Sequence, residues 1–227
     1  MGGEYFVRVA IGIPPFYAEM LVDTSNDLAW LQCQPCSRCY PQPGPIFDPK
    51  SSSTFHYDSL YKQNRGCYED QCTYHQTYGD GSLTDGSVVQ DLVTVGNGVI
   101  YGFVFGCGHS IVMEASAHYG GILGLGWGRV SIINQITTPI GRVFSYCLAT
   151  SANPSPGWIT FGREAIAVGN FWIPMIHNEE APTFYYVGLL GIGVGGIRLP
   201  ISKDFFSLRK GKGGVILDTG TTLTRFP

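Results

Sequence analysis

Two short segments that lie far apart in the chain end in the same pattern of residues. Residues 20–25 read MLVDTS and residues 215–220 read VILDTG, so each is an apolar run followed by Asp, Thr and a small residue. An apolar run of this length predicts a buried strand, and burying a carboxylate is costly unless it is paired or shares a proton. We therefore predict that Asp23 and Asp218 meet. Two facing carboxyls that share one proton can perform the acid–base chemistry of acid proteolysis.

Each Asp segment follows another stretch that predicts a strand. Residues 5–12 alternate between polar and apolar side chains, and after a Pro-rich turn residues 16–22 return as a second strand that delivers Asp23. Residues 185–192 repeat the first of these strands, and residues 214–218 repeat the second. The repeat predicts two similar units, each of which carries one acid.

Between the two Asp segments the sequence predicts a β-hairpin. Residues 72–78 and 83–95 have the character of strands, and residues 79–82 read GDGS, which is a turn signal. Residues 101–107 and the glycine-rich residues 120–126 predict two more strands. No window keeps a 3.6-residue apolar period over three turns, and the chain contains 31 Gly and 14 Pro. We therefore predict an all-β fold with many turns.

The composition argues against several classes of function. The formal net charge is -3 and Lys and Arg are scattered, which does not predict nucleic-acid binding. No apolar run approaches the length that crosses a bilayer, so no membrane segment is expected. Residues 1–3 lack a basic region followed by an apolar stretch, and we expect that any secretory signal has already been removed.

Seven cysteines are present, and most of them cluster. A zinc site needs four ligands, and the nearby His56 and His75 do not complete a zinc-finger spacing, so the pattern favours disulfides over the alternative of zinc. Disulfides indicate an oxidising compartment. The odd count leaves one thiol unpaired, or its partner lies outside this chain. The cysteines are Cys33, Cys36, Cys39, Cys67, Cys72, Cys107 and Cys147.

A Ser- and Pro-rich loop divides the chain. Residues 149–157 are the best linker candidate, and they separate an N-terminal lobe at residues 1–148 from a partial C-terminal lobe at residues 158–227. The first unit continues for more than a hundred residues after Asp23, whereas nine residues follow Asp218. The second lobe is therefore expected to be truncated.

The order of these motifs resembles that of the pepsin-like aspartic proteinases, specifically their plant nepenthesin-like branch. The resemblance runs from about Tyr5 to the end of the chain and implies an all-β, bilobal pepsin-like acid protease fold with a truncated C-terminal lobe. The cysteine-rich residues 33–49 look like an insertion of that plant branch. The matching segments are residues 23–33, 78–82, 105–108, 121–126, 144–148 and 218–222.

The resemblance also implies roles for the repeated Asp-Thr motifs. Asp23 and Asp218 would hold the nucleophilic water, one accepting its proton while the other protonates the scissile carbonyl. Their titration would belong to the pair and would give activity at acid pH. Thr24 and Thr219 would hydrogen-bond across the lobes and fix the two carboxylates in one plane.

A third set of implied roles concerns the hairpin. Tyr78 would lie on a flap over the substrate, and Trp30 would donate its indole N–H to the Tyr78 hydroxyl. The alternative is that these two side chains are ordinary core and hairpin aromatics. The other residues expected to support the site or bind substrate are Ser25, Asn26, Gly79, Asp80, Gly220, Thr221 and Thr222.

Two residues depart from the family pattern. Ser25 stands where the family usually has Gly, and Asn26 stands where it usually has Ser. Gly in a tight loop permits close approach of the backbone, so Ser25 adds bulk and a hydroxyl beside Asp23. Asn26 could still hydrogen-bond the outer oxygen of that carboxylate. Because both acids are present, we expect weakened or altered activity rather than none.

The sequence, taken with the resemblance, predicts an aspartic endopeptidase that cleaves an extended peptide in an interlobe cleft. No metal, organic cofactor, nucleic-acid partner or membrane is implied, and we expect a monomer in the secretory pathway, either extracellular (in the apoplast) or vacuolar. The alternatives are an inactive truncated fragment of a protease, a non-catalytic binding or inhibitor protein like the xylanase inhibitors, and a secreted structural β protein. The last would be favoured if Asp23 and Asp218 lay far apart.

Overall fold

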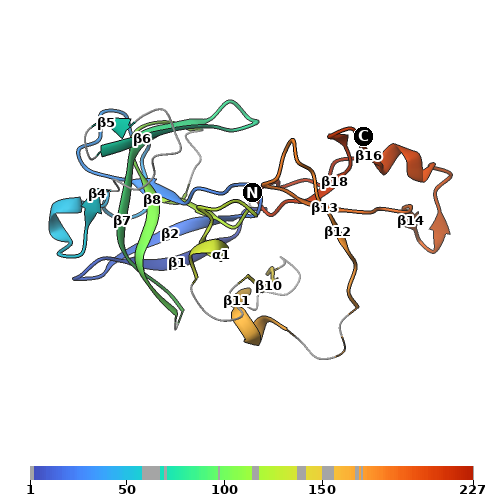
Figure 1. Ribbon diagram of the computed structural model, residues 1–227, viewed down its shortest axis with the longest axis horizontal. Helices are drawn as coiled ribbons and strands as arrows, with labels where there is room; N and C mark the ends of the chain where they lie inside the picture. The colour runs from blue at the N-terminus through green and yellow to red at the C-terminus, as the bar shows by residue number, and fades with distance from the viewer. Residues whose placement is uncertain are drawn as a thin grey trace.

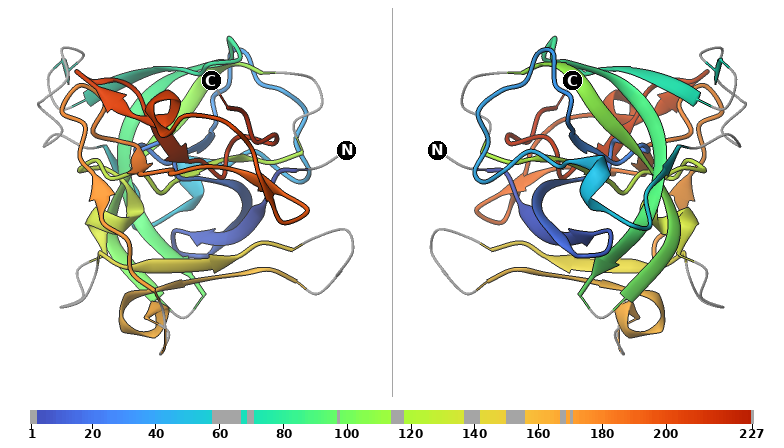
Figure 2. Two further views of the ribbon diagram at one scale, coloured as in Figure 1. Left: turned by 90° about the vertical axis from the view of Figure 1, so that its right-hand side faces the viewer. Right: turned by 90° about the vertical axis from the view of Figure 1, so that its left-hand side faces the viewer.

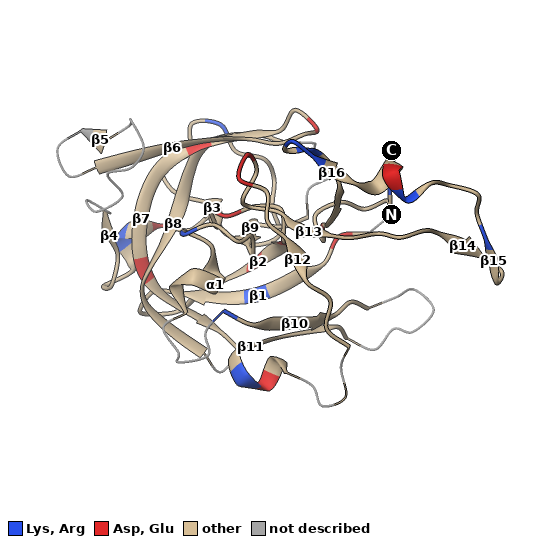
Figure 3. Ribbon diagram, turned by 45° about the vertical axis from the view of Figure 1, so that its right-hand side comes forward, with Lys and Arg blue, Asp and Glu red and all other residues tan. Residues whose placement is uncertain are grey.

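The computed structural model describes residues 3–57, 67–68, 71–96, 98–113, 118–136, 142–149, 156–166, 169 and 171–226. Strands dominate this part of the chain, and its helical pieces are short: α1 (Ile132–Gln135) and the 3-10 helices η1 (Pro49–Ser51), η2 (Gly162–Ala165) and η3 (Lys203–Phe206). The prediction of an all-β fold is confirmed. Within the described residues, no helix has the length and apolar character needed to cross a membrane. Lys and Arg are dispersed over several elements of the ribbon (Figure 3).

The N-terminal part of the chain forms one large curved sheet (Figure 1). Its strands are β1 (Phe6–Ile11), β2 (Phe16–Asp23), β3 (Trp30–Gln32), β4 (His56–Tyr57), β5 (Cys67–Tyr68), β6 (Gln71–Thr77), β7 (Leu83–Val95), β8 (Gly98–Val112) and β9 (Gly121–Gly124). The order is β1-β2-β9-β3-β8-β7-β6-β5, with β4 beside β7. Because β1 also pairs with β7, part of the sheet closes on itself, and the long strands β7 and β8 curve around the β1–β2 hairpin (Figure 2).

Both faces of the central strands are buried, which explains their almost continuous apolar sequence. Successive residues of a strand point to opposite faces. Met20 and Val22 of β2 therefore join one hydrophobic cluster, and Leu21 joins the other. Ile122 and Leu123 of β9 divide in the same way. Packing on both sides thus fixes the strand that ends at the first acid.

The hairpin predicted between the two Asp segments is present. β6 ends at Thr77, which pairs with Leu83 at the start of β7. In the turn, the Asp80 carboxylate accepts hydrogen bonds from the Ser82 N–H and hydroxyl, each at 2.9 Å. Gly81 has a φ of 89°, a conformation that favours glycine. The Gly-Asp-Gly-Ser sequence therefore supplies both the bend and its internal hydrogen bonds.

The remaining strands form smaller sheets. They are β10 (Phe144–Cys147), β11 (Trp158–Phe161), β12 (Met175–Ile176), β13 (Tyr185–Val187), β14 (Gly193–Val194), β15 (Ile197–Arg198), β16 (Leu208–Arg209), β17 (Lys212–Gly213) and β18 (Val215–Leu217). β10 pairs with β11, β14 with β15, and β16 with β17. β12, β13 and β18 form a three-stranded sheet, in which β18 pairs with β13 and, among the described residues, with no strand on its other edge.

The linker predicted at residues 149–157 falls between two paired strands. β10 and β11 lie on either side of it and form an antiparallel pair. Residues 150–155 of the linker lie outside the described residues. The lobe boundaries at 148 and 158 therefore stay a prediction.

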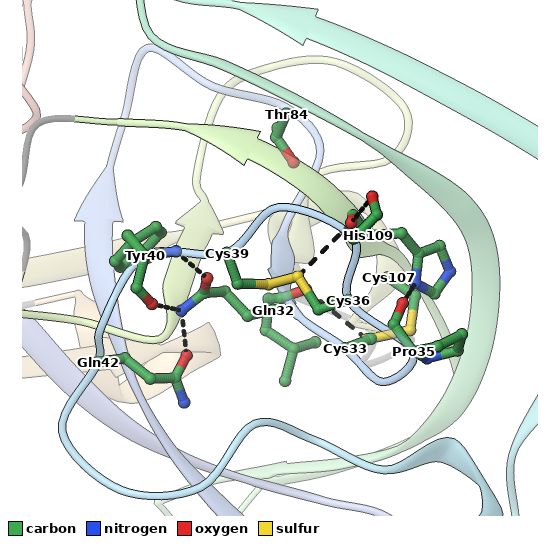
Figure 4. Close-up of a disulfide and its surroundings, with 12 residues drawn as sticks. Gln32, Cys33, Pro35, Cys36, Cys39, Tyr40, Gln42, Thr84, Cys107 and His109 are labelled. Carbon is green, nitrogen blue, oxygen red and sulfur yellow. Dashed lines mark hydrogen bonds between the residues drawn. A yellow bond between two sulfur atoms is a disulfide. The ribbon is translucent and has the colours of Figure 1, made fainter.

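The cysteines form disulfides, as the sequence favoured. The bridges are Cys33–Cys107, Cys36–Cys39 and Cys67–Cys72, while Cys147 is unpaired and exposed. No group of three or more potential metal ligands occurs among the described His, Cys, Asp and Glu residues. In the close-up of Figure 4, the Cys36–Cys39 bridge lies between His109 and a buried pair, Gln32 and Tyr40, whose side-chain and backbone groups exchange two hydrogen bonds of 3.1 Å.

Candidate active site

Asp23 is the last residue of β2 and lies inside the large sheet. β2 pairs with β1 on one side and runs parallel to β9 on the other, where Asp23 is opposite Gly124. Only 4% of the surface of Asp23 is exposed. Because strands flank β2 on both sides, the sheet fixes the backbone that carries this carboxyl.

Asp218 directly follows β18, the counterpart of β2. β18 pairs antiparallel with β13, and Tyr185 is opposite Leu217, so each acid lies at the end of the second strand of an antiparallel pair, as the repeated sequence pattern predicted. Asp218 is partly buried. Its Oδ1 accepts the Gly220 N–H at 2.9 Å, and its Oδ2 accepts the Thr221 hydroxyl at 2.6 Å.

Thr24 and Thr219 join the two Asp loops. The Thr24 N–H donates to Thr219 Oγ1 at 3.1 Å, and the Thr219 N–H donates to Thr24 Oγ1 at 3.0 Å. Each hydroxyl also donates across to the opposite strand, Thr24 to the Leu217 carbonyl at 3.0 Å and Thr219 to the Val22 carbonyl at 2.8 Å. The hydrogen bonds between these threonines that the resemblance implied are present, and they bring together loops separated by 195 residues.

At this junction the loop that carries Asp218 lies against the Asp23 carboxyl. A Cβ atom added at Gly220 would lie 2.7 Å from Asp23 Oδ1, so the second loop presents bare backbone to the first carboxyl. Burial, and to a smaller extent the charge of Asp218, raise the pKa of Asp23. The arrangement contradicts a structure in which the two Asp-Thr motifs lie far apart.

Ser25 places its hydroxyl beside Asp23 as the sequence predicts, whereas Asn26 makes a different contact from the predicted one. The Ser25 N–H and hydroxyl both donate to Asp23 Oδ1 at 2.8 Å, and these two bonds oppose the rise in the pKa of Asp23. The sequence predicts a hydrogen bond from the Asn26 amide to the outer oxygen of Asp23. In the structure the amide donates instead to the Tyr78 hydroxyl at 3.1 Å. That expectation was wrong because the Asn26 amide is directed to the Tyr78 hydroxyl, a partner 52 residues away in the chain.

Tyr78 opens the turn of the β6–β7 hairpin and reaches back to the sheet. The indole N–H of Trp30 donates to the Tyr78 hydroxyl at 2.6 Å, which is the contact that the resemblance implied. Trp30 is fully buried, so it is also a core residue. Tyr78 packs on the same hydrophobic cluster, and burial raises its pKa far above the usual range, so its hydroxyl stays protonated.

Five of the expected site residues are exposed: Gly79, Asp80, Gly220, Thr221 and Thr222. Gly79 and Asp80 form the exposed tip of the hairpin, where Asp80 stabilises the turn through Ser82. Thr222 is also exposed, and its Cγ2 methyl lies beside Gly3. The structure therefore places Thr222 at the N-terminal segment of the chain, apart from the hydrogen bonds that hold the two carboxyls.

Asp27 is a site residue that our reading of the sequence missed. Its Oδ1 accepts the Gly128 N–H at 2.7 Å, and its Oδ2 accepts the Thr183 hydroxyl at 2.8 Å. The Tyr185 hydroxyl donates to the Leu125 carbonyl at 2.6 Å beside it. A carboxyl four residues after Asp23 and directly before a buried apolar run was the available signal. Asp27 ties the first Asp loop to the chain that leads into β13.

Comparisons with known proteins agree with this geometry. The family model described as xylanase inhibitor N-terminal matches residues 5–163, and the one described as xylanase inhibitor C-terminal matches residues 184–227. The protein ASPARTIC PROTEASE IN GUARD CELL 2 of Arabidopsis thaliana is 42% identical over 99% of this chain and 49% of its own length. Aspartic proteinase nepenthesin-2 of Nepenthes gracilis is 38% identical over 99% of this chain and 53% of its own length.

The chain spans about half the length of the curated relatives it matches. The first family model alone covers most of the described strands and the first Asp loop, and the second covers the other Asp loop. Both the repeated acids and the order of motifs resemble those of relatives named as aspartic proteinases. The chain therefore belongs to the pepsin-like aspartic protease family, and its relatives include members of the nepenthesin-like plant branch.

Proposed function

We propose that this chain carries the catalytic centre of an aspartic endopeptidase that hydrolyses peptide bonds at acid pH through a water held by Asp23 and Asp218. The observation that carries the proposal is the reciprocal bonding of Thr24 and Thr219, because it holds the two Asp loops against each other. The names of the relatives support it. The chain spans about half the length of these relatives, so we also propose, and do not take as shown, that the whole protein is an aspartic endopeptidase.

In this mechanism the two carboxyls share one proton. Burial favours the proton on Asp23, so Asp23 would protonate the scissile carbonyl oxygen while Asp218 accepts a proton from the attacking water. The water oxygen bonds to the carbonyl carbon. When the carbon–nitrogen bond of the adduct breaks and the nitrogen takes up a proton, the products are a carboxylic acid and an amine.

The proposed substrate is an extended peptide in a cleft between the lobes, covered by the hairpin that Tyr78 opens. The exposed backbone of Gly79 and Asp80 at the hairpin tip would be free to bond such a peptide. The three disulfides support a location in the secretory pathway, either the apoplast or the vacuole, because such bonds persist in oxidising compartments.

A non-catalytic binding or inhibitor protein is the second candidate. One observation favours it, namely that both matching family models are described as xylanase inhibitor domains. The bonding around both carboxyls favours the peptidase instead, since an inhibitor has no need of two acids held in this way.

The test uses the 227-residue chain and a fusion in which this chain replaces the matching half of nepenthesin-2. Cleavage of a denatured protein at pH 3–4 is measured with and without pepstatin. We expect pepstatin-sensitive cleavage by the fusion, lost by a factor of about a thousand or more in Asp23→Asn and in Asp218→Asn. The exposed Asp204→Asn is the matched control. Cleavage that survives in both active-site variants contradicts the proposal, and tight binding of a xylanase without cleavage supports the second candidate.

A further inference from the structure

The two Asp loops use the third residue after the acid differently. In the second loop this residue is Thr221, whose hydroxyl donates to Asp218 Oδ2 at 2.6 Å. In the first loop it is Asn26, whose amide donates instead to the Tyr78 hydroxyl at 3.1 Å. Ser25, one residue earlier, supplies the hydroxyl that bonds Asp23. The carboxyl-bonding hydroxyl is therefore one position earlier in the first loop, which leaves Asn26 to contact the hairpin.

Asn26 is buried within the first Asp loop, between β2 and β3. Only 3% of its surface is exposed, and its backbone carbonyl accepts the Gly126 N–H at 2.8 Å. Trp30, the other donor to the same hydroxyl, is fully buried in β3. Both donors are therefore buried, whereas Tyr78 begins a turn whose next residues are exposed.

The Tyr78 hydroxyl can accept two hydrogen bonds and donate one. The N–H groups of Trp30 and Asn26 occupy the two acceptor positions, so its proton remains available to another partner. Gly79, Asp80 and Gly81 make their described polar contacts within the turn itself. Among the described polar contacts of residues 78–81, those with groups outside the hairpin are therefore all made by the Tyr78 hydroxyl.

We propose that Asn26 is a positioning residue that, together with Trp30, holds the flap tyrosine Tyr78 down beside Asp23. Two hydrogen bonds to the Tyr78 hydroxyl, from Trp30 and Asn26, must then break before the flap lifts. If position 26 instead carried a hydroxyl residue that bonded the Asp23 carboxyl, only the bond from Trp30 would have to break. The meaning of this contact for catalysis rests on the proposed function, because a flap that covers substrate must open to admit it. The contact also leaves the Tyr78 proton free to bond a substrate.

The test is hydrogen exchange at the backbone amides of Tyr78, Gly81 and Ser82 in the 227-residue chain. Asn26→Ser should speed exchange at these amides about fivefold, the factor expected when one hydrogen bond is lost. The control is Asn178→Ser, which removes another buried amide, bonded to the Gly211 carbonyl at 3.2 Å, and should leave the flap unchanged. Tyr78→Phe, which removes the shared acceptor, should speed exchange at least as much as Asn26→Ser.

A double variant separates direct contact from general loosening. With Phe at position 78, Asn26→Ser should have no further effect on exchange at the flap. Equal effects of Asn26→Ser with Tyr and with Phe at position 78 would overturn the inference. If Asn26→Ser does not fold, an unchanged flap in Tyr78→Phe overturns it as well. Exchange does not require peptidase activity, so an inactive protein with the expected exchange pattern refutes the proposed function alone.

Discussion

At the scale of single residues, the site depends on the hydrogen bonds that the buried Asp23 carboxyl receives from protein groups in place of water. Burial raises the pKa of this carboxyl, and the two donors from Ser25 partly offset that rise. Asp218, in contrast, is less buried and accepts bonds from Gly220 and Thr221. The two acids therefore have different surroundings although their sequence motifs are nearly the same.

The pH dependence of stability should report on Asp23. Its pKa in the native state is raised above the usual value of 3.8, so the native state holds the proton more tightly than the unfolded chain does. This contribution to stability is complete below about pH 4 and is lost as the pH rises through the raised pKa. Asp23→Asn cannot ionise, so its melting temperature at pH 7 should exceed that of the parent by about 2–4 °C for each kcal/mol regained.

Thermal denaturation between pH 3 and pH 7 checks this expectation. The two proteins should melt at similar temperatures near pH 3 and diverge above pH 4. Asp204→Asn, at an exposed ion pair with Arg209, should follow the parent throughout. If Asp23→Asn and the parent lost stability equally between pH 4 and pH 7, the raised pKa of Asp23 would be refuted.

Ser25 should tune the rate of the proposed reaction. Ser25→Gly removes the hydroxyl that donates to Asp23 Oδ1 but keeps the backbone N–H that bonds the same atom. Loss of a hydrogen bond to a neutral group changes free energies by about 0.5–1.5 kcal/mol, so we expect a change of up to about tenfold in kcat/KM. The optimum of cleavage should move to higher pH. The nepenthesin-2 fusion is the protein to assay, and an unchanged rate and pH profile would refute a role for this hydroxyl.

At the scale of the elements, β3 and β8 are joined covalently next to the site. Cys33, one residue after the end of β3, is bridged to Cys107 of β8, and both side chains are buried. β3 also carries Trp30, so this bridge fixes the strand whose indole N–H bonds the Tyr78 hydroxyl. The Cys67–Cys72 bridge instead joins the neighbouring strands β5 and β6.

The two bridges should differ in what they contribute to stability. Cys33 and Cys107 are 74 residues apart, and Cys67 and Cys72 are five apart. Since a longer closed loop restricts the unfolded chain more, replacing both cysteines of the first pair by Ser should cost about 4 kcal/mol, against about 2 kcal/mol for the second pair. Urea denaturation of the two double variants measures the difference. Equal losses would mean that chain entropy does not explain the effect of these bridges.

At the scale of the whole molecule, hydrogen bonds between distant segments join the N-terminal sheet to the C-terminal strands. Besides the two threonines, the Trp127 N–H donates to the Thr183 carbonyl at 2.9 Å, and the Trp127 and Tyr185 rings meet edge to face. These contacts surround the two Asp loops. The relative position of the acids is therefore a property of the junction and not of either loop alone.

Removing one threonine hydroxyl should weaken this junction. Thr24→Val leaves the buried Thr219 N–H and the part-buried Leu217 carbonyl without their partner, which should cost about 2–6 kcal/mol because each orphaned group costs about 1–3 kcal/mol. Thr24→Ser keeps the hydroxyl and should lose less than half as much. Chemical denaturation compares the two variants with the parent. Similar stability of the Val and Ser variants would show that the hydroxyl is not what joins the loops.

Much of this arrangement could be predicted from the sequence, because it depends on local pattern. The apolar runs before Asp23 and Asp218 form strands, and the Gly-Asp-Gly-Ser segment forms a turn. The two Asp loops meet as the repeat predicted, and their threonines bond as the family resemblance implied. The contacts of Asn26 with Tyr78 and of Asp27 with Thr183 could not be read in this way. Their partners lie 52 and 156 residues away, and only tertiary packing decides which polar group reaches which.

The edge of β18 that faces away from β13 has a consequence for the chain in solution. β2 has a neighbour on each side, whereas the described structure gives β18 one neighbour, and 50% of the surface of Leu217 is exposed beside it. The Leu217 carbonyl accepts the Thr24 hydroxyl, but a strand edge without a neighbouring strand, next to an apolar side chain, forms a template for another extended segment. Concentrated samples of the 227-residue chain should therefore aggregate by edge-to-edge pairing, and an added apolar peptide that runs parallel to β18 should keep them dispersed.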